Sequence, residues 1–257
     1  MANEVLYDAK GHVAVITLNR PEALNAINPP LGMALRDAFI RYRSDPEMRC
    51  AVLTGAGRAF SAGADLKYQA GQGGEYFSNQ FWNRYETIFV ECYKPVIAAI
   101  NGYCYAAAMN LMFAATDIRI CSTEARFCYA EVLRGFSGAG PALAWLPRSV
   151  PFTHAMKWLL TGEVFGPQEA RRVGMVNDVV APDQLMAAAL AMAEEIAALP
   201  PLAVRSIKES VLRGLGMDVV NATHFAHTLS TITRQSDDAQ EGPRAFKEKR
   251  PPVYRGR

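Results

Sequence analysis

The apolar residues near the N-terminus change from a strand-like to a helix-like spacing. Residues 5–7 and 13–18 are apolar runs on either side of Lys10-Gly11, and this arrangement predicts a β-hairpin. Residues 31–42 place their apolar side chains at helical spacing. We therefore predict a helix there that ends at Ser44-Asp45-Pro46, where the proline cannot continue it.

Residues 94–120 carry the clearest hydrophobic pattern in the chain. Residues 96–100 are an apolar, β-branched run that stops at Asn101-Gly102, which is typical of a buried strand ended by a turn. Residues 106–115 are almost all alanine, methionine, leucine and phenylalanine, with Asn110 as the polar exception, so they predict a buried helix. Small residues at the start of that helix would let a ligand approach its free N–H groups, although an ordinary core helix explains the same pattern equally well.

The neighbouring segments continue the alternation of strands and helices. Residues 51–53 predict a buried strand that opens into a glycine- and alanine-rich loop at 55–63. Residues 68–80 are polar and glycine-rich, and we expect a mobile loop. An aromatic-rich helix is expected over 81–92, and residues 127–132 predict another extended segment.

From residue 141 onward the pattern is helical, with successive helices separated by prolines and glycines. Strands that alternate with helices up to residue 132, followed by helices alone, predict an α/β core with a helical C-terminal part. The amphipathic segments 202–213 and 217–233 fit a subunit interface or ordinary packing between helices.

Composition narrows the class of protein. The chain has 257 residues, 50% of them apolar, which is enough for a sizeable core. Its net charge of +2 gives no electrostatic reason to expect nucleic acid or a membrane as a partner. The five cysteines lie mostly in apolar runs and predict reduced thiols rather than disulfides. The N-terminus lacks the apolar core of a signal peptide, so we expect a soluble, cytoplasmic protein.

Several kinds of catalytic site find no support in the sequence. His224 and His227 lie three apart but have no acidic or thiol partner at ligand spacing, so no metal site is predicted. Ala139 occupies a position where a nucleophile elbow needs glycine. The glycines between residues 55 and 63 lack the spacing of a dinucleotide-binding loop.

Glu131 is the remaining candidate because it interrupts the apolar run CYAEVL. Such an acid is commonly a structural ion-pair partner. Desolvation would instead raise its pKa toward the range that suits general acid–base catalysis. The loops at 61–65 and 106–109 offer backbone amides beside it. One carboxylate and two such donors suffice for proton transfer next to a carbonyl that becomes an enolate.

Several segments, in order along nearly the whole chain, resemble the crotonase superfamily, which includes the enoyl-CoA hydratases and enoyl-CoA isomerases. The segments that carry the resemblance are VAVITLNRPEALNAI, AVLTGAGRAFSAGADLK, KPVIAAINGY, EARRVGMVNDVV and DDAQEGPRAFKEKRPPVYRGR. The resemblance implies an α/β spiral of repeated ββα units over residues 1–195, with the acyl-CoA site. It further implies a helical part over 196–257 that forms a homotrimer or a hexamer, a dimer of trimers, and contacts CoA.

The resemblance also implies site residues. The substrate would be a coenzyme A thioester, with no metal and no prosthetic group. Glu131 matches the catalytic glutamate, while Ala62 and Ala107 match the two oxyanion-hole amides. The positions that match CoA contacts are Glu22, Ala23, Leu24, Ala62, Gly63, Ala64, Asp65, Leu66, Phe246 and Lys249. Residues 68–85 are expected to line the acyl pocket.

Departures from the family pattern decide the expected reaction. Alanines replace the glycine-rich stretch at 106–108, which restricts φ. Counting from Asn101 puts Asn110 where hydratases carry a second glutamate, whereas counting back from Asp117 puts Leu111 there. Neither is acidic, so double-bond isomerisation is preferred. The alternatives are hydration, in which Asn110 holds the water, another reaction such as hydrolysis or decarboxylation, and a catalytically weak acyl-CoA-binding protein.

Overall fold

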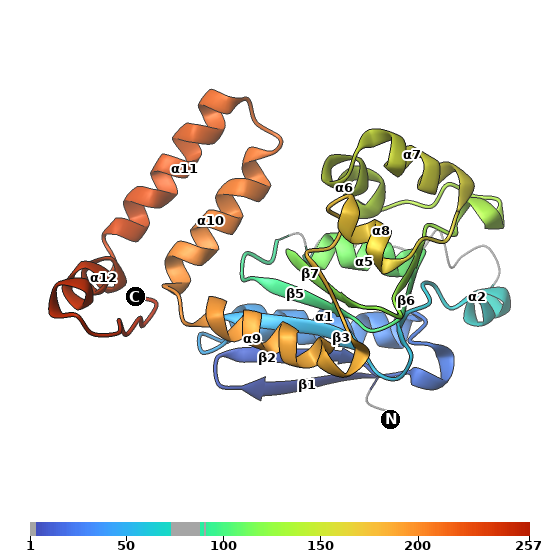
Figure 1. The fold of residues 1–257 in the computed structure, drawn as a ribbon, viewed down its shortest axis with the longest axis horizontal. Helices are drawn as coiled ribbons and strands as arrows, with labels where there is room; N and C mark the ends of the chain where they lie inside the picture. The colour runs from blue at the N-terminus through green and yellow to red at the C-terminus, as the bar shows by residue number, and fades with distance from the viewer. Residues whose placement is uncertain (1–3, 73–87, 90) are drawn as a thin grey trace.

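The computed structural model describes residues 4–72, 88–89 and 91–257, which form two packed β-sheets surrounded by helices (Figure 1). The larger sheet has the order β1-β2-β3-β5-β7-β9, and the smaller has the order β4-β6-β8. The strands of the larger sheet are β1 (Val5–Lys10), β2 (Val13–Leu18), β3 (Cys50–Gly55), β5 (Val96–Ile100), β7 (Ile118–Ser122) and β9 (Asp178–Val180). Those of the smaller sheet are β4 (Ala59–Ser61), β6 (Tyr103–Tyr105) and β8 (Arg126–Cys128).

Consecutive strands along the chain alternate between the two sheets. β3, β5 and β7 lie in the larger sheet, and the strand that follows each of them, β4, β6 and β8, lies in the smaller sheet. Apart from the antiparallel β1–β2 hairpin, all the strand pairs among the described residues are parallel. The chain therefore winds as a spiral of repeated units, which confirms the predicted fold class.

Helices cover both faces of the larger sheet (Figure 1). Their bounds are α1 (Pro29–Ser44), α2 (Leu66–Gln72), α5 (Ala107–Ala115), α6 (Pro141–Ser149), α7 (Phe152–Thr161), α8 (Pro167–Arg172), α9 (Leu185–Ala197), α10 (Pro201–Gly214), α11 (Val219–Arg234) and α12 (Asp237–Glu248). Three short 3₁₀ helices join them within the described residues: η1 (Pro21–Ala23), η2 (Val132–Arg134) and η3 (Pro182–Gln184).

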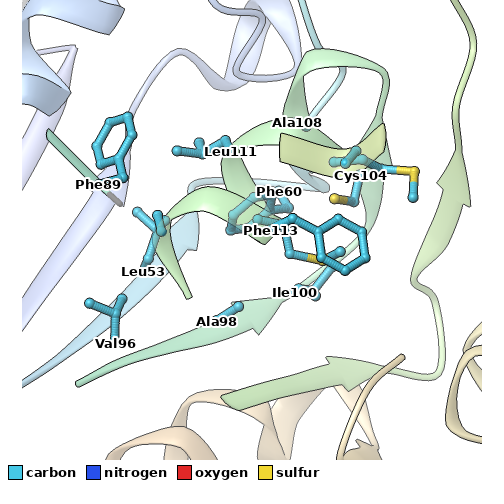
Figure 2. Close-up of a cluster of buried hydrophobic side chains, with 14 of the residues drawn as sticks. Leu53, Phe60, Phe89, Val96, Ala98, Ile100, Cys104, Ala108, Leu111 and Phe113 are labelled. Carbon is cyan, nitrogen blue, oxygen red and sulfur yellow. The ribbon is translucent and has the colours of Figure 1, made fainter. Parts of the chain in front are cut away.

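The central strands are buried on both faces, which explains their continuous apolar sequences. Side chains alternate along a strand, so Val52 of β3 packs toward α9 while Leu53 packs toward the main core. In β5, Ile97 lies in the cluster with α9, and Ile100 lies in the main core. In Figure 2, Leu53, Phe60, Ala98 and Ile100 gather near Ala108 and Leu111 of α5, so this helix is embedded in the core.

The C-terminal helices α10, α11 and α12 extend away from the sheets (Figure 1). Neither α10 nor α11 contains a buried residue. Several of their apolar side chains are exposed, including Ile207, Val211, Val220 and Ile232. An apolar surface of this extent is typical of a face that another protein surface covers.

Across the described residues, no single helix combines the length and apolar character needed to span a membrane. The segments Pro182–Ala197 and Pro201–Gly214 pass that test only as a pair, and they are bent by 105° relative to each other.

The structure confirms the hairpin, the helix α1, the strand β5 and the buried helix α5. Three expectations were wrong. The segment 55–63 is not a loop throughout, because it contains β4. Residues 127–132 are not extended throughout, because β8 ends at Cys128 and a 3₁₀ helix follows. The region after residue 141 is not helical alone, because β9 pairs with β7. The predicted loop at 68–80 begins within α2, and its remainder, with most of the predicted helix at 81–92, lies outside the described residues.

Ala106, the residue before α5, has φ +52° and ψ −120°. Glycine adopts such a conformation without strain, whereas a Cβ makes it unfavourable. A residue other than glycine held there costs about 1–3 kcal/mol. Ala106 therefore holds strained backbone at the start of this helix.

Replacing Ala106 by glycine removes that strain and should stabilise the protein. The relief is partly offset by the greater freedom of glycine in the unfolded chain, which leaves a net gain of about 1 kcal/mol. Ala107→Gly is the matched control, because it adds a glycine inside the helix and should destabilise by up to about 1 kcal/mol. Denaturant unfolding of both variants measures the effect, and equal losses of stability would contradict this account.

Candidate active site

A cavity of about 580 Å³ lies where the three strands of the smaller sheet end. Its lining residues follow β4, β6 and β8, so all three loops leave the carboxyl edge of one parallel sheet. Ligand sites in parallel sheets form at that edge, because the connecting loops diverge there. The lining residues are Ala62, Ala64, Leu66, Tyr105, Ala106, Ala107, Asn110, Ala130, Glu131, Arg134, Phe136, Ser137, Gly138 and Ala139.

The loop after β4 supplies a backbone donor, although not the one predicted. The Ala62 N–H donates to the Leu24 carbonyl oxygen at 2.9 Å, so the prediction that it is an oxyanion donor was wrong. The residues on either side of Ala64 pair with Ile27: the Ile27 N–H donates to Gly63 O at 2.7 Å, and the Asp65 N–H donates to Ile27 O at 3.0 Å. This parallel pairing turns the Ala64 N–H the other way, and it has no partner among the described residues.

The start of α5 supplies the second donor. The first N–H groups of a helix have no carbonyl partner within the helix. Met109 and Asn110 donate back to Ala106 O, but the Ala107 N–H has no partner in the described part of the chain. Ala64 and Ala107 line the same cavity. Two residues with unpaired backbone amides, one in the loop after β4 and one at the start of α5, therefore line the same cavity.

Glu131 lies at the N-terminus of η2, in the loop after β8. It is only 5% exposed, and its Oε2 atom has no hydrogen-bond partner. None of the ion pairs among the described residues includes Glu131, so the structural ion-pair alternative is not supported. Burial raises the pKa of this carboxyl from 4.5 to about 7, and a hydrogen bond from its own backbone opposes the rise.

Gly138 fixes the wall beside this carboxyl. Its φ is +68°, and a Cβ added there would lie 2.8 Å from Glu131 Cγ and 2.6 Å from the Tyr129 hydroxyl. The Tyr129 hydroxyl donates to Ser137 O at 3.2 Å. The loop after η2 therefore packs directly against Glu131, and a side chain at residue 138 would displace it.

Of the two residues that could match the second glutamate of hydratases, Asn110 lines the cavity. Leu111 is 1% exposed and lies in the core. The Asn110 side chain connects α5 to the start of α6. Its Nδ2 donates to Ala139 O at 3.1 Å, and its Oδ1 accepts from Ala142 N at 3.0 Å. This amide caps a helix start and keeps one N–H and one lone pair for a ligand or water.

The residues predicted to bind CoA are divided between two regions. Leu24 of the 22–24 loop lies beside Ala62, through the hydrogen bond given above. Asp65 has other partners: it pairs with Arg20 at 3.1 Å, and its other oxygen accepts from Tyr68 N at 3.1 Å, which caps α2. Phe246 and Lys249 lie at the end of α12, far along the molecule from α2 (Figure 1). Phe246 is 87% exposed.

Seven lining residues were not identified as site residues from the sequence: Tyr105, Ala130, Arg134, Phe136, Ser137, Gly138 and Ala139. Arg134, Phe136 and Ser137 follow Glu131 closely, but the sequence predicted an extended segment only over 127–132 and gave no sign that the chain after it turns back to the cavity. Most of the region expected to line the acyl pocket, residues 73–85, lies outside the described residues. Within the described chain, no group of three or more His, Cys, Asp or Glu residues could hold a metal ion.

Comparison with known proteins gives consistent matches over the full chain. The family model described as enoyl-CoA hydratase/isomerase matches residues 8–257. The chain is 39% identical to (E)-benzylidenesuccinyl-CoA hydratase of Thauera aromatica, over 98% of this chain and 99% of that protein. It is 35% identical to carnitinyl-CoA dehydratase of Salmonella enteritidis, with 100% of both chains covered. The crystal structure of an enoyl-CoA hydratase from Bacillus anthracis superposes with a TM-score of 0.95 at 31% identity, covering 99% of this chain and 100% of that one.

The pKa of Glu131 makes stability depend on pH. The folded carboxyl binds its proton more tightly than the unfolded one, whose pKa is near 4.5, so wild-type stability should fall as pH rises from about 4.5 to about 7. Glu131→Gln removes this loss, which is at most about 3 kcal/mol. Thermal unfolding at pH 5 and pH 8 should show the variant gaining on the wild type at pH 8. The same difference in melting temperature between variant and wild type at both pH values would contradict this prediction. A gain at pH 8 in the exposed control Glu124→Gln would contradict it as well.

Proposed function

The chain belongs to the enoyl-CoA hydratase/isomerase family, and from that premise we propose that it adds water reversibly to the double bond of a 2-enoyl-CoA, with Glu131 as the single acid–base group. The observation that carries this proposal is the Glu131 carboxyl, which is buried, unpartnered at Oε2 and on the wall of the cavity that both free amides reach.

In the proposed reaction the thioester carbonyl oxygen accepts hydrogen bonds from the Ala64 and Ala107 N–H groups. These donors stabilise the negative charge that develops on this oxygen when the enolate forms, and one such donor is typically worth about 10²–10³ in rate. Fixed backbone donors in a cavity lined mostly by small apolar side chains need no reorganisation as the charge appears.

Glu131 transfers both protons. Its carboxylate takes a proton from the water whose oxygen bonds to the β-carbon, and the resulting acid gives a proton to the α-carbon of the enolate. A pKa of about 7 suits both steps, because neither the acid nor the base form is scarce near neutral pH. Because one group acts at both carbons, the oxygen from water and the new α-hydrogen are added to the same face of the double bond, which is syn addition.

Hydration is placed first because the relatives named above are called hydratases and a dehydratase. Asn110 supports it by keeping one amide N–H that could orient the water. Isomerisation of a 3-enoyl-CoA is the second candidate. The observation that favours it is that Glu131 is the only carboxylate lining the described cavity, and one base can move a proton between two carbons.

We also propose that the CoA portion follows the 22–24 loop and residues 63–66, with Phe246 and Lys249 contributed to the site of a neighbouring subunit. The separation of α12 from α2 and α5 (Figure 1) and the exposed apolar side chains of α10 and α11 support a homotrimer or a dimer of trimers. Sedimentation of the purified protein at the mass of one chain would contradict this arrangement.

The reaction is tested by supplying wild type, Glu131→Gln and Glu124→Gln with a 2-enoyl-CoA in water and, separately, with a 3-enoyl-CoA. We expect hydration by the wild type and by Glu124→Gln, and a loss of at least about 10²-fold in kcat for Glu131→Gln, because the only proton-transfer group is removed. Shifting of the 3-enoyl double bond without hydration would favour the isomerase. Turnover that survives Glu131→Gln would refute the mechanism.

A further inference from the structure

Arg134 is the only cationic residue among those that line the described cavity, and Glu131 is the only acidic one. The other lining groups are alanine, glycine and other neutral side chains. The proton-transfer chemistry proposed above uses Glu131 and two amides but gives Arg134 no role. A single unassigned charge in such a cavity is a candidate determinant of the substrate.

The local backbone directs Arg134 toward the same side as Glu131. Glu131 has helical φ and ψ angles at the start of η2, and the Arg134 N–H donates to Glu131 O at 2.9 Å. Residues three apart eclipse in a 3₁₀ helix, because it has three residues per turn. Leu133 points elsewhere, since its side chain packs against Gly162, where an added Cβ would lie 2.6 Å from Leu133 Cγ.

The two charges do not neutralise each other. The Arg134 guanidinium takes part in no hydrogen bond or ion pair among the described residues, and Glu131 Oε2 is unpartnered as well. The raised pKa of Glu131 comes mainly from burial of its carboxyl. Arg134 is exposed, so its guanidinium is solvated and can donate to a group that enters the cavity.

The position of Arg134 separates it from the proposed path of CoA. In the order β4-β6-β8, the loop after β4 and the loop after β8 lie on opposite sides of β6 and of the Ala107 amide. Residues 63–66 leave from β4, whereas Arg134 follows β8. A thioester held at Ala107 with its CoA portion on the β4 side would direct its acyl group toward Arg134.

We propose that Arg134 selects substrates whose acyl chain carries a second carboxylate, so that the natural substrate class is the CoA monothioester of an unsaturated dicarboxylic acid. The proposal rests on the proposed function in taking this cavity as the acyl-CoA site. A guanidinium matches a carboxylate through two parallel N–H···O bonds, which is the geometry for which arginine is used in recognition. The same charge disfavours a cationic acyl group.

The test compares two substrates of equal length, 2-hexenoyl-CoA and the CoA monothioester of 2-hexenedioic acid. The wild type should prefer the second by roughly 10- to 100-fold in kcat/KM, the usual worth of hydrogen bonds to a charged group. Arg134→Leu should abolish that preference, and Arg134→Lys should keep part of it, because lysine retains the charge without the paired donors. Arg148→Leu on α6 is the control and should keep the wild-type ratio.

A binding experiment keeps this test independent of the reaction. The affinities of wild type and Arg134→Leu for adipoyl-CoA, hexanoyl-CoA and free CoA are measured by calorimetry. The proposal expects a 10- to 100-fold loss for adipoyl-CoA alone. An equal loss for free CoA would assign Arg134 to the CoA phosphates, and a substrate ratio unchanged by Arg134→Leu would overturn the proposal. If the wild type turns over neither enoyl-CoA, the proposed reaction fails, while the adipoyl-CoA preference still decides the role of Arg134.

Discussion

The close approach of two backbone segments at Gly63 is the constraint on which the site depends. A Cβ at this residue would lie 2.6 Å from Tyr105 O, 3.0 Å from the Ala106 Cβ and 3.2 Å from Ala107 N, and its φ is +91°. No side chain fits there. Because the loop after β4 can therefore touch the start of α5, Ala64 and Ala107, whose amides have no partner in the described chain, line one cavity. Ala106, which lies at this contact, has a positive φ.

Electrostatics then determine what that cavity can do. Two unpaired N–H groups favour negative charge on a carbonyl oxygen, while burial favours the neutral form of Glu131. A carboxyl with a pKa of about 7 can act as base and as acid within one turnover. Hydration and isomerisation share these groups. In hydration Glu131 takes a proton from water and gives one to the α-carbon, whereas in isomerisation it moves a proton between two carbons of the substrate. The environment of Asn110 and the acyl group itself therefore matter more to the choice than the fold does.

The sequence predicted what depends on local pattern and missed what depends on tertiary hydrogen bonding. Strands β1, β2, β3 and β5 and helix α5 followed from the hydrophobic pattern, and Glu131 stood out as an acid in an apolar run. Ala62 was wrong as a donor because its N–H is consumed by Leu24 O, a contact between segments that no local pattern shows. Arg134 was missed because the segment after β8 turns into a 3₁₀ helix. β9 was missed because three residues carry too little pattern to outweigh their helical surroundings.

Exchange of the α-hydrogen of a saturated acyl-CoA tests the central claim most directly, because it needs the oxyanion donors and Glu131 but neither water addition nor a double bond. Butyryl-CoA would be incubated with the protein in D₂O, and deuterium at the α-carbon followed by NMR. The account predicts incorporation with the wild type and none above background with Glu131→Gln. Incorporation that persists in Glu131→Gln, or no incorporation with a folded wild type that binds butyryl-CoA, would contradict it.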